Sequence, residues 1–326
     1  MASRCYQLGP PNLQGENAFS LLTMVKRPPP EGDSKALWGI VSIGMAAALW
    51  SVAAVRARDL FDRGVDPLEL AEARSFIAAA CLALLPAARK KRTGGSMAAV
   101  VVLGLSIAMV NAVYYSAIAR LDVAVALVLQ YTALALVVGW VAFQRRKAPS
   151  SDVGIALVVT FAGVVLVSGV VGADVGPIDA IGVGFGLSAA IFFATYTLLS
   201  ERAGAAYGVL GALLRGFCAA AVMWTIFQST RGWPAELFEA DNIVAVLFVG
   251  IAGTFAPFIL FLWGVQQVRA ERAAIAATSE PILAGVIAWV WLGQSLTAVQ
   301  IAGGALILGG VVALQIRRKE VDIPEL

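Results

Sequence analysis

A short polar run interrupts a long apolar stretch near the C-terminal end of the chain. The run Thr278–Pro281 lies inside a segment that is otherwise almost wholly apolar, from Ala273 to Leu292. An acidic side chain at the centre of a membrane helix costs about 2.5–3.5 kcal/mol on insertion scales. Pro281 also leaves the carbonyl of Ala277 without its helical hydrogen bond. A polar break at mid-depth favours a substrate route through a membrane; the alternative is a kinked packing helix whose Glu280 bonds to a neighbouring helix.

Other side chains that could contact a substrate fall near the middle of apolar segments. Asn111 and Tyr115 are four residues apart and share a helix face, and Phe192, Thr195 and Tyr196 share another. A site lined by aromatic rings with a few amides and hydroxyls suits a flat, apolar solute with a small polar head. We therefore expect a substrate-binding site formed by Trp50, Asn111, Tyr114, Tyr115, Gln130, Tyr131, Thr132, Phe192, Thr195, Tyr196, Trp263, Thr278, Ser279 and Glu280.

Purely structural roles are alternatives to substrate binding for some of these aromatic and amide residues. Tyrosine and tryptophan near helix ends commonly form the belt at the membrane interface. That interpretation is favoured for four tryptophans: Trp224, Trp233, Trp289 and Trp291. The amides of Asn111 and Gln130 need a partner in hydrocarbon, which either a cavity or an interhelical hydrogen bond supplies.

Two arginines also lie inside apolar segments, Arg74 and Arg215. They could bind a carboxylate or close a gate. We favour a structural role, either a salt bridge between Arg74 and Glu69 or Glu72, or snorkelling to the interface.

The composition is that of a polytopic membrane protein. Of 326 residues, 60% are hydrophobic and only 14% are charged, against about 25% charged in soluble domains. Apolar stretches of about 20 residues indicate helices rather than barrel strands. The chain has no histidine, and its three cysteines have no ligand-like spacing. We therefore expect no metal, no cofactor and no enzyme activity, and we attribute the net charge of +3 to membrane topology rather than to nucleic-acid binding.

Ten apolar segments are predicted to be transmembrane helices in an all-α membrane protein. A disordered cytosolic tail is expected over residues 1–35 and a short cytosolic tail over 317–326. Sixteen lysines and arginines flank the segments on the side assigned to the cytosol, against five on the other side. This asymmetry predicts that both termini are cytosolic. The predicted spans are 36–56, 67–86, 97–118, 121–143, 153–171, 180–200, 207–228, 243–266, 273–292 and 298–316.

The two halves of the chain, 36–171 and 180–316, resemble each other. Residues 74–80 (Arg-Ser-Phe-Ile-Ala-Ala-Ala) align with residues 215–221 (Arg-Gly-Phe-Cys-Ala-Ala-Ala). Thr132 falls opposite Ser279 in the same alignment. Because each half has five spans, the second copy must enter the membrane from the opposite side, which predicts two inverted five-helix repeats.

These features resemble the drug/metabolite transporter superfamily, and within it the ten-helix proteins with two EamA-type domains. The resemblance rests on Trp50, on the paired arginines 74 and 215, on residues 129–132 (Leu-Gln-Tyr-Thr), on residues 279–282 (Ser-Glu-Pro-Ile) and on residues 289–294 (Trp-Val-Trp-Leu-Gly-Gln). Gln294 replaces the glutamate with which the family's segment ends. Bacterial aromatic amino-acid exporters of the YddG type are the most similar members in length.

The resemblance and the repeat together imply a secondary transporter in the cell inner membrane. It would move small organic metabolites by alternating access, with amino acids, aromatic ones above all, as the favoured substrates and export as the direction. The expected partners are this substrate and the lipid bilayer, and small residues on the fifth and tenth spans allow a homodimer. The alternatives are an exporter of cationic drugs, drawn by Glu280, and, more distantly, a membrane-embedded enzyme or a receptor without flux.

Overall fold

The computed structural model describes residues 33–89, 96–144, 151–167, 179–232, 234–265, 267–268 and 276–317. All regular secondary structure in these ranges is helical. The helices are α1 (Asp33–Asp62), α2 (Pro67–Ala83), α3 (Met97–Arg120), α4 (Val123–Tyr131), α5 (Ala133–Gln144), α6 (Ser151–Val167), α7 (Ala180–Tyr207), α8 (Val209–Gln228), η1 (Ala235–Phe238), α9 (Ala240–Gly250), η2 (Ile251–Phe255), α10 (Ala256–Val265), α12 (Ser279–Leu292) and α13 (Ala298–Arg317). The two predicted tails lie outside these ranges, except that residues 33–35 begin α1 and Arg317 ends α13.

Five stretches in the described residues are long and apolar enough to cross a membrane, and shorter apolar helices accompany them. The five are Leu37–Asp62, Met97–Arg120, Ala180–Leu199, Val209–Gln228 and Ala240–Gly264. The chain is therefore helical and membrane-like, whereas ten complete spans and the side on which each terminus lies stay predictions.

Three of the predicted spans are not continuous α-helices. The span 121–143 breaks at Thr132 between α4 and α5, and the span 273–292 breaks at Thr278 before α12. The span 243–266 contains one π-helical turn, η2, between α9 and α10. The polar run Thr278–Pro281 indicated the second of these breaks, whereas the apolar pattern of the sequence did not reveal the other two.

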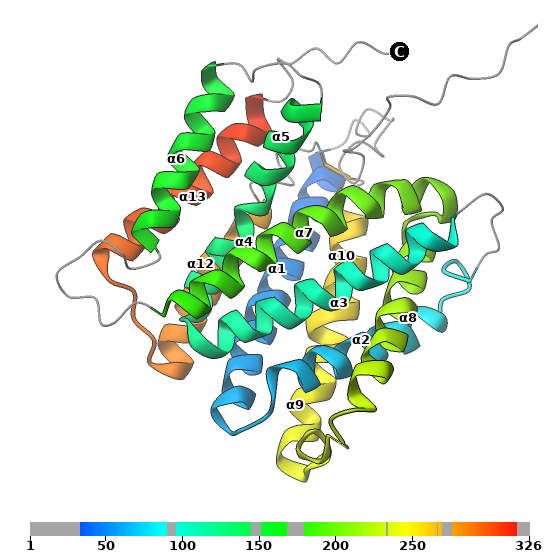
Figure 1. The fold of residues 1–326 in the computed structure, drawn as a ribbon. Helices are drawn as coiled ribbons and strands as arrows, with labels where there is room; N and C mark the ends of the chain where they lie inside the picture. Colours follow the sequence, from blue (N-terminus) through cyan, green and yellow to red (C-terminus); the bar gives the residue numbers. More distant parts are fainter. Residues whose placement is uncertain are drawn as a thin grey trace, which may run out of the picture.

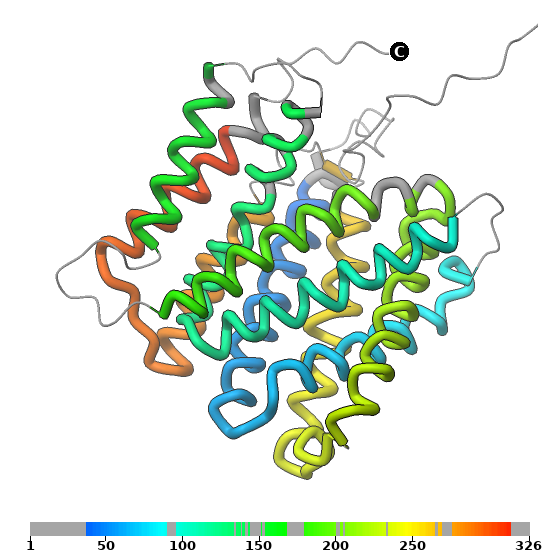
Figure 2. The backbone as a smooth tube through the Cα atoms, viewed as in Figure 1, coloured from blue at the N-terminus to red at the C-terminus, as the bar shows by residue number. Residues whose placement is uncertain are grey.

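Helices from the two halves of the chain are interleaved. In Figure 1, α6 lies beside α13, and α3 runs along α7 in front of α1 and α10. The sequence colouring of Figure 2 shows the same mixing, with the blue α1 next to the yellow α10 and the red α13 next to the green α6. Other pairs that cross the halves are α2 with α8, α3 with α8, and α4 with α12.

Glycines allow α6 and α13 to approach closely. A Cβ atom on Gly163 would lie 2.7 Å from the carbonyl oxygen of Gly303, and one on Gly310 would lie 3.0 Å from the carbonyl oxygen of Ala156. Glycines at these positions therefore form a close-packing surface between the two helices. Gly163 and Gly303 thus contact each other within one chain, and they are not free to form the predicted homodimer contact. A Cβ atom on Gly309, in contrast, would meet nothing within 4 Å.

Ion pairs lie near helix ends at the side of the molecule that was assigned to the cell exterior, and two of them link separate segments of the chain. Every arginine counted on that side pairs with an aspartate: Arg56 and Arg63 with Asp59, Arg58 with Asp62, Arg120 with Asp179, and Arg231 with Asp66. The N–H of Gly182, in the first turn of α7, and the guanidinium of Arg120 both bond to the Asp179 carboxylate, and they lower its pKa below the ordinary value. These arginines therefore have structural partners near helix ends, in addition to their contribution to the Lys/Arg asymmetry across the membrane.

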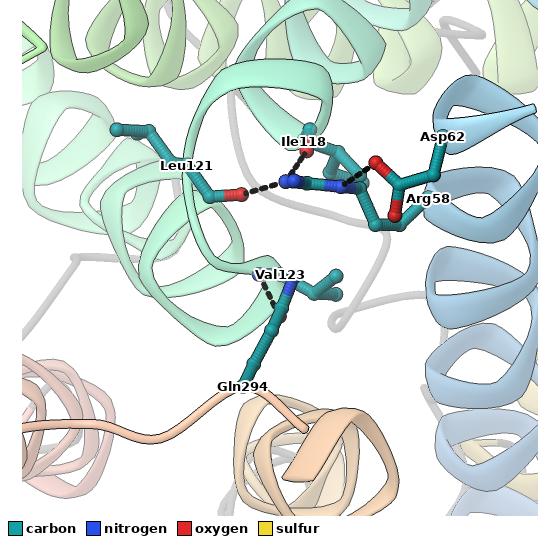
Figure 3. Close-up of polar contacts among 6 residues, drawn as sticks. All are labelled: Arg58, Asp62, Ile118, Leu121, Val123 and Gln294. Carbon is teal, nitrogen blue, oxygen red and sulfur yellow. Dashed lines mark hydrogen bonds and ion pairs between the residues drawn. The ribbon is translucent and has the colours of Figure 1, made fainter. Parts of the chain in front are cut away.

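The turn between α3 and α4 is held from both halves of the chain (Figure 3). The Arg58 guanidinium on α1 donates to the carbonyl oxygens of Ile118 and Leu121, at 2.9 and 3.0 Å. The N–H of Val123 donates to the side-chain oxygen of Gln294 at 3.1 Å. Gln294 thus satisfies a free N–H at the start of α4. Gln294 lacks the charge of the family's glutamate, but its side-chain oxygen still accepts a hydrogen bond.

We expect Gly163→Ala to destabilise the protein, because the added methyl group meets backbone atoms that cannot move aside. Overpacking of this kind costs about 1–3 kcal/mol. The matched control is Gly309→Ala on α13, which meets open space and should leave stability unchanged or slightly raised. Thermal unfolding of the purified variants in detergent measures the difference, and equal melting temperatures for the two variants would contradict the close-packing role.

Candidate functional site

The two helix breaks at Thr132 and Thr278 meet inside the bundle. Tyr131 ends α4, and its hydroxyl lies 2.8 Å from the carbonyl oxygen of Ala277 and 2.9 Å from Oε2 of Glu280. Pro281 is the third residue of α12. In the first turn of a helix a backbone N–H has no partner within the helix, so proline costs no helical hydrogen bond there. The Ala277 carbonyl, which was predicted to lack a helical partner, is thus satisfied by a side chain from the other half of the chain.

Tyr131 has a single hydroxyl proton and two acceptors within bonding distance. When it donates to the Ala277 carbonyl, a hydrogen bond to Glu280 requires a proton on the carboxyl group. When Glu280 is ionised and accepts from Tyr131, the carbonyl loses its donor. The site therefore has two hydrogen-bonding arrangements that differ by one proton on Glu280.

Glu280 is also held through its backbone. Its carbonyl oxygen accepts from Ser51 Oγ on α1 at 2.8 Å, and Ser51 is fully buried. The neighbouring Trp50 packs its ring against Phe258 and Phe261 of α10, with centroids 5.5 and 5.7 Å away. The residue as a whole is half-buried. Its backbone is thus fixed by α1, and its carboxyl group is held by Tyr131 of α4.

Two predicted site tyrosines of α3 lie together. The rings of Tyr114 and Tyr115 are 5.6 Å apart. Asn111, one turn earlier, is buried and donates to the carbonyl of Ile107 in its own helix. Tyr114 and Tyr115 thus form a ring pair, whereas the Asn111 amide is bonded within its own helix.

Arg74 joins the site from α2, which the sequence interpretation did not expect. Its Nε donates to Thr254 Oγ1 at 3.0 Å, and its guanidinium lies over the Tyr115 ring, 5.0 Å from the centroid. Within the described residues no carboxylate lies within 4.0 Å of it, so the predicted salt bridge to Glu69 or Glu72 is absent. Its exposed fraction is 9%, so it does not snorkel.

Thr254 was missed because it lies in the π-helical turn η2. Its hydroxyl donates to the carbonyl of Val249 at 2.9 Å while accepting from Arg74. Turns of this kind often mark functional sites. The available signal was a pair of glycines, Gly250 directly before the turn and Gly253 within it. The backbone at these glycines approaches Ile77 and Ala53 too closely for a Cβ atom.

Several predicted site hydroxyls bond to nearby backbone instead. Thr132 Oγ1 donates to the Leu129 carbonyl at 2.7 Å, and Ser279 Oγ donates to the Ala276 carbonyl at 2.6 Å. They satisfy acceptors at the two breaks. Thr278, which lies at the second break, is buried.

Gln130 differs from these hydroxyls in having an unsatisfied atom. Its Oε1 is buried and has no hydrogen-bond partner in the described part of the chain. A substrate N–H would supply the missing donor.

The predicted residues of α7 and α10 are less closely tied to this cluster. Thr195 donates to the Ile191 carbonyl of its own helix, Phe192 is half-buried, and Tyr196 packs against the Phe193 ring at 5.9 Å. Trp263 is 48% exposed.

The tryptophans assigned to the interface divide into two groups. Trp224 is only 6% exposed, so its assignment to the interface belt is wrong, because α8 buries it against the core. Trp289 and Trp291 are exposed, at 64% and 50%. Trp233 lies outside the described residues.

We expect Tyr131→Phe to lower stability, because it leaves the partly buried Ala277 carbonyl without a donor. An unsatisfied buried acceptor costs about 1–3 kcal/mol. Glu280→Gln should cost less, since the amide can donate to Tyr131 and keep the tyrosine bonded to the carbonyl. Thermal unfolding in detergent compares the two variants, and a Tyr131→Phe protein as stable as the parent would contradict this hydrogen-bonding scheme.

Known proteins with similar sequences are transporters. A stretch of 64 residues is 42% identical to an uncharacterized transporter of Archaeoglobus fulgidus, covering 20% of this chain and 24% of that protein. The threonine/homoserine exporter RhtA of Escherichia coli strain K12 is 29% identical over 68% of this chain and 73% of its own. A solved crystal structure aligns with 87% of this chain and 97% of its own, with a TM-score of 0.53 and 20% identity, which shows a shared fold.

The model of the EamA-like transporter family matches the chain twice, over residues 37–169 and 180–315. With the long apolar helices, this match makes the chain a multi-pass protein of the inner membrane. It also indicates a transporter rather than an enzyme. The chain belongs to the EamA-like transporter family.

Proposed function

We propose that the chain is a secondary transporter that exports amino acids by alternating access. The observation that carries the proposal is the meeting of two broken helices at Tyr131, Ala277 and Glu280. Discontinuous helices place backbone and side-chain polar groups at mid-membrane, where a transported solute must be held. One helix comes from each half of the chain, so a movement between the halves would open this contact.

Helix pairing supports the proposal of inverted repeats over residues 36–171 and 180–316. The pairs α2 with α8 and α6 with α13 each join helices at corresponding positions of the two halves, and α3 with α7 corresponds to α1 with α10. A pseudo-two-fold axis produces this pattern of pairs. Each match of the family model falls within one proposed repeat. Two related halves can exchange inward and outward shapes around a central site, with both termini in the cytosol.

The favoured substrates are aromatic amino acids. Tyr114 and Tyr115 on α3 offer two rings 5.6 Å apart, and aromatic contacts add stabilisation to the burial of an aromatic solute. A second candidate is a small hydroxylated amino acid, because the 29% identical relative is named as a threonine/homoserine exporter. Export of cationic drugs is the remaining alternative, with Glu280 as the group that would attract the cation.

Flux into proteoliposomes that hold only the purified protein tests the substrate class. Vesicles preloaded with unlabelled phenylalanine should accumulate labelled tryptophan by exchange, and a parallel set should exchange threonine for homoserine if the small substrates are preferred. Repeating the assay with a pH step separates facilitated exchange from coupling to protons at Glu280. Absence of flux for all four amino acids, from protein shown to be folded, would overturn the amino-acid assignment.

Variants of the site should reduce flux without preventing membrane insertion. We expect Glu280→Gln, and the double variant Tyr131→Ala with Tyr196→Ala, to lower the rate by about tenfold or more, as the loss of one charge-assisted hydrogen bond would. Gly309→Ala, on the open side of α13, is the matched control and should transport normally. Unchanged rates in both site variants would remove these residues from the substrate site.

A further inference from the structure

Two ion pairs join the halves of the chain at the end of the bundle that the lysine and arginine asymmetry assigns to the cell exterior. Arg120, the last residue of α3, pairs with Asp179 in front of α7, and their Nε and Oδ2 atoms lie 2.9 Å apart. Arg231, in the turn after α8, pairs with Asp66 in front of α2 at 3.0 Å. The other three ion pairs of the described residues stay within residues 56–63.

Two further contacts at the same end also cross between the halves. The Arg56 guanidinium on α1 lies over the ring of Trp291 on α12, 5.4 Å from its centroid. The N–H of Val123 donates to the side-chain oxygen of Gln294 at 3.1 Å (Figure 3). These two contacts and the two ion pairs are called the outer contacts below. Together they tie α1, α2 and the turn between α3 and α4 to α7, α8 and α12.

The outer contacts lie between the Tyr131–Glu280 contact and this end of the bundle. At a rise of about 1.5 Å per residue, Trp291 is about 17 Å from Glu280 along α12, and Val123 is about 12 Å from Tyr131 along α4. Both helices thus run from the candidate site to the outer contacts. A solute that leaves the site toward the exterior passes between the two halves, so these contacts lie on its way.

The two ion pairs are exposed enough to break and re-form. The side chains of Arg120 and Asp179 are 43% and 28% exposed, and those of Arg231 and Asp66 are 37% and 34% exposed. Water can therefore solvate both charges of each pair when they separate. Exposed ion pairs contribute little stability individually, because solvation of the separated charges offsets most of their attraction.

The aspartates keep a partner when their arginines leave. Asp66 accepts a hydrogen bond from the N–H of Leu68 at 2.7 Å, and Asp179 accepts one from the N–H of Gly182 at 2.8 Å. Both carboxylates thereby cap the first turn of a helix, where a negative charge is favourable without any arginine. Separation of the halves at this end therefore leaves neither carboxylate without a hydrogen bond.

We propose that the outer contacts form a reversible latch, which holds the two halves together in this conformation and separates when the candidate site opens to the exterior. The inference rests on the proposed function, because alternating access requires this movement. Since each ion pair is weak, loss of one should raise the ratio of open to closed molecules by about two- to fivefold rather than unfold the protein.

Arg63 offers a matched control for the two latch arginines. It pairs with Asp59 at 2.8 Å, and its side chain is 41% exposed. Arg63→Gln removes the same charge at the same end of the bundle without breaking a contact between the halves. The arginines are changed rather than their partners, because substitution of Asp66 or Asp179 would also remove a helix cap.

Labelling of a single cysteine from outside intact cells measures the opening. Ser279→Cys places a thiol next to Glu280 in sequence and changes only the hydroxyl oxygen to sulfur. A membrane-impermeant maleimide added to the cells then reports how often this position is open to the exterior. The native cysteines are first replaced by alanine at three positions: Cys5, Cys81 and Cys218.

In this background we expect Arg120→Gln and Arg231→Gln to be labelled about two- to fivefold faster than the Ser279→Cys protein alone. The double variant should be faster by about the product of the single effects, because the two pairs are separate contacts that oppose the same opening. Arg63→Gln should be labelled at the unchanged rate. Arg120→Lys keeps the charge and should also stay near that rate.

Equal labelling of Arg120→Gln, Arg231→Gln and Arg63→Gln would overturn the latch, as would an Arg120→Lys protein labelled as fast as Arg120→Gln. If one glutamine variant does not fold, the other decides against the same control. Amino-acid exchange in proteoliposomes separates this inference from the proposed function. Exchange by the parent protein with equal labelling of all variants overturns the latch alone, whereas faster labelling without any exchange overturns the amino-acid assignment and leaves the latch standing.

Discussion

The need to satisfy every backbone polar group inside a membrane governs the centre of this molecule. Pro281 cannot donate to Ala277, and water is not available there to replace the missing bond. The hydroxyl of Tyr131 supplies it, at 2.8 Å. That single contact requires α4 to end beside the start of α12, and it thereby brings a tyrosine from one half of the chain against the carboxyl group of Glu280 from the other.

The same contact connects structure to transport. The Tyr131 hydroxyl contacts both the Ala277 carbonyl and the Glu280 carboxyl group, so a change in one of these contacts also changes the other. Protonation of Glu280, or its pairing with a cationic group, changes which acceptor takes the Tyr131 proton. A bound solute can therefore alter the junction between the two halves through hydrogen bonding alone.

Packing elsewhere gives this centre rigid support. Gly163 and Gly303 bring α6 and α13 into backbone contact, and Gln294 with Arg58 holds the turn that leads into α4. At the opposite side of the centre, the π-helical turn lets Thr254 reach Arg74. The polar groups are thus positioned by helices from both halves rather than by loops, which favours a precise site.

The sequence by itself determined the helical class, the transporter family and the place of the polar break. Apolar segment lengths, the scarcity of charge and the run at Thr278–Pro281 are local properties, and local properties are readable along a chain. Tyr131 and Glu280 were both expected at the site for the same reason. The tertiary structure alone decided which side chains meet. The break at Thr132, the π-helical turn at Thr254 and the unpaired state of Arg74 depend on helices distant in sequence, because the energy of a buried polar group is set by the partners that folding brings to it.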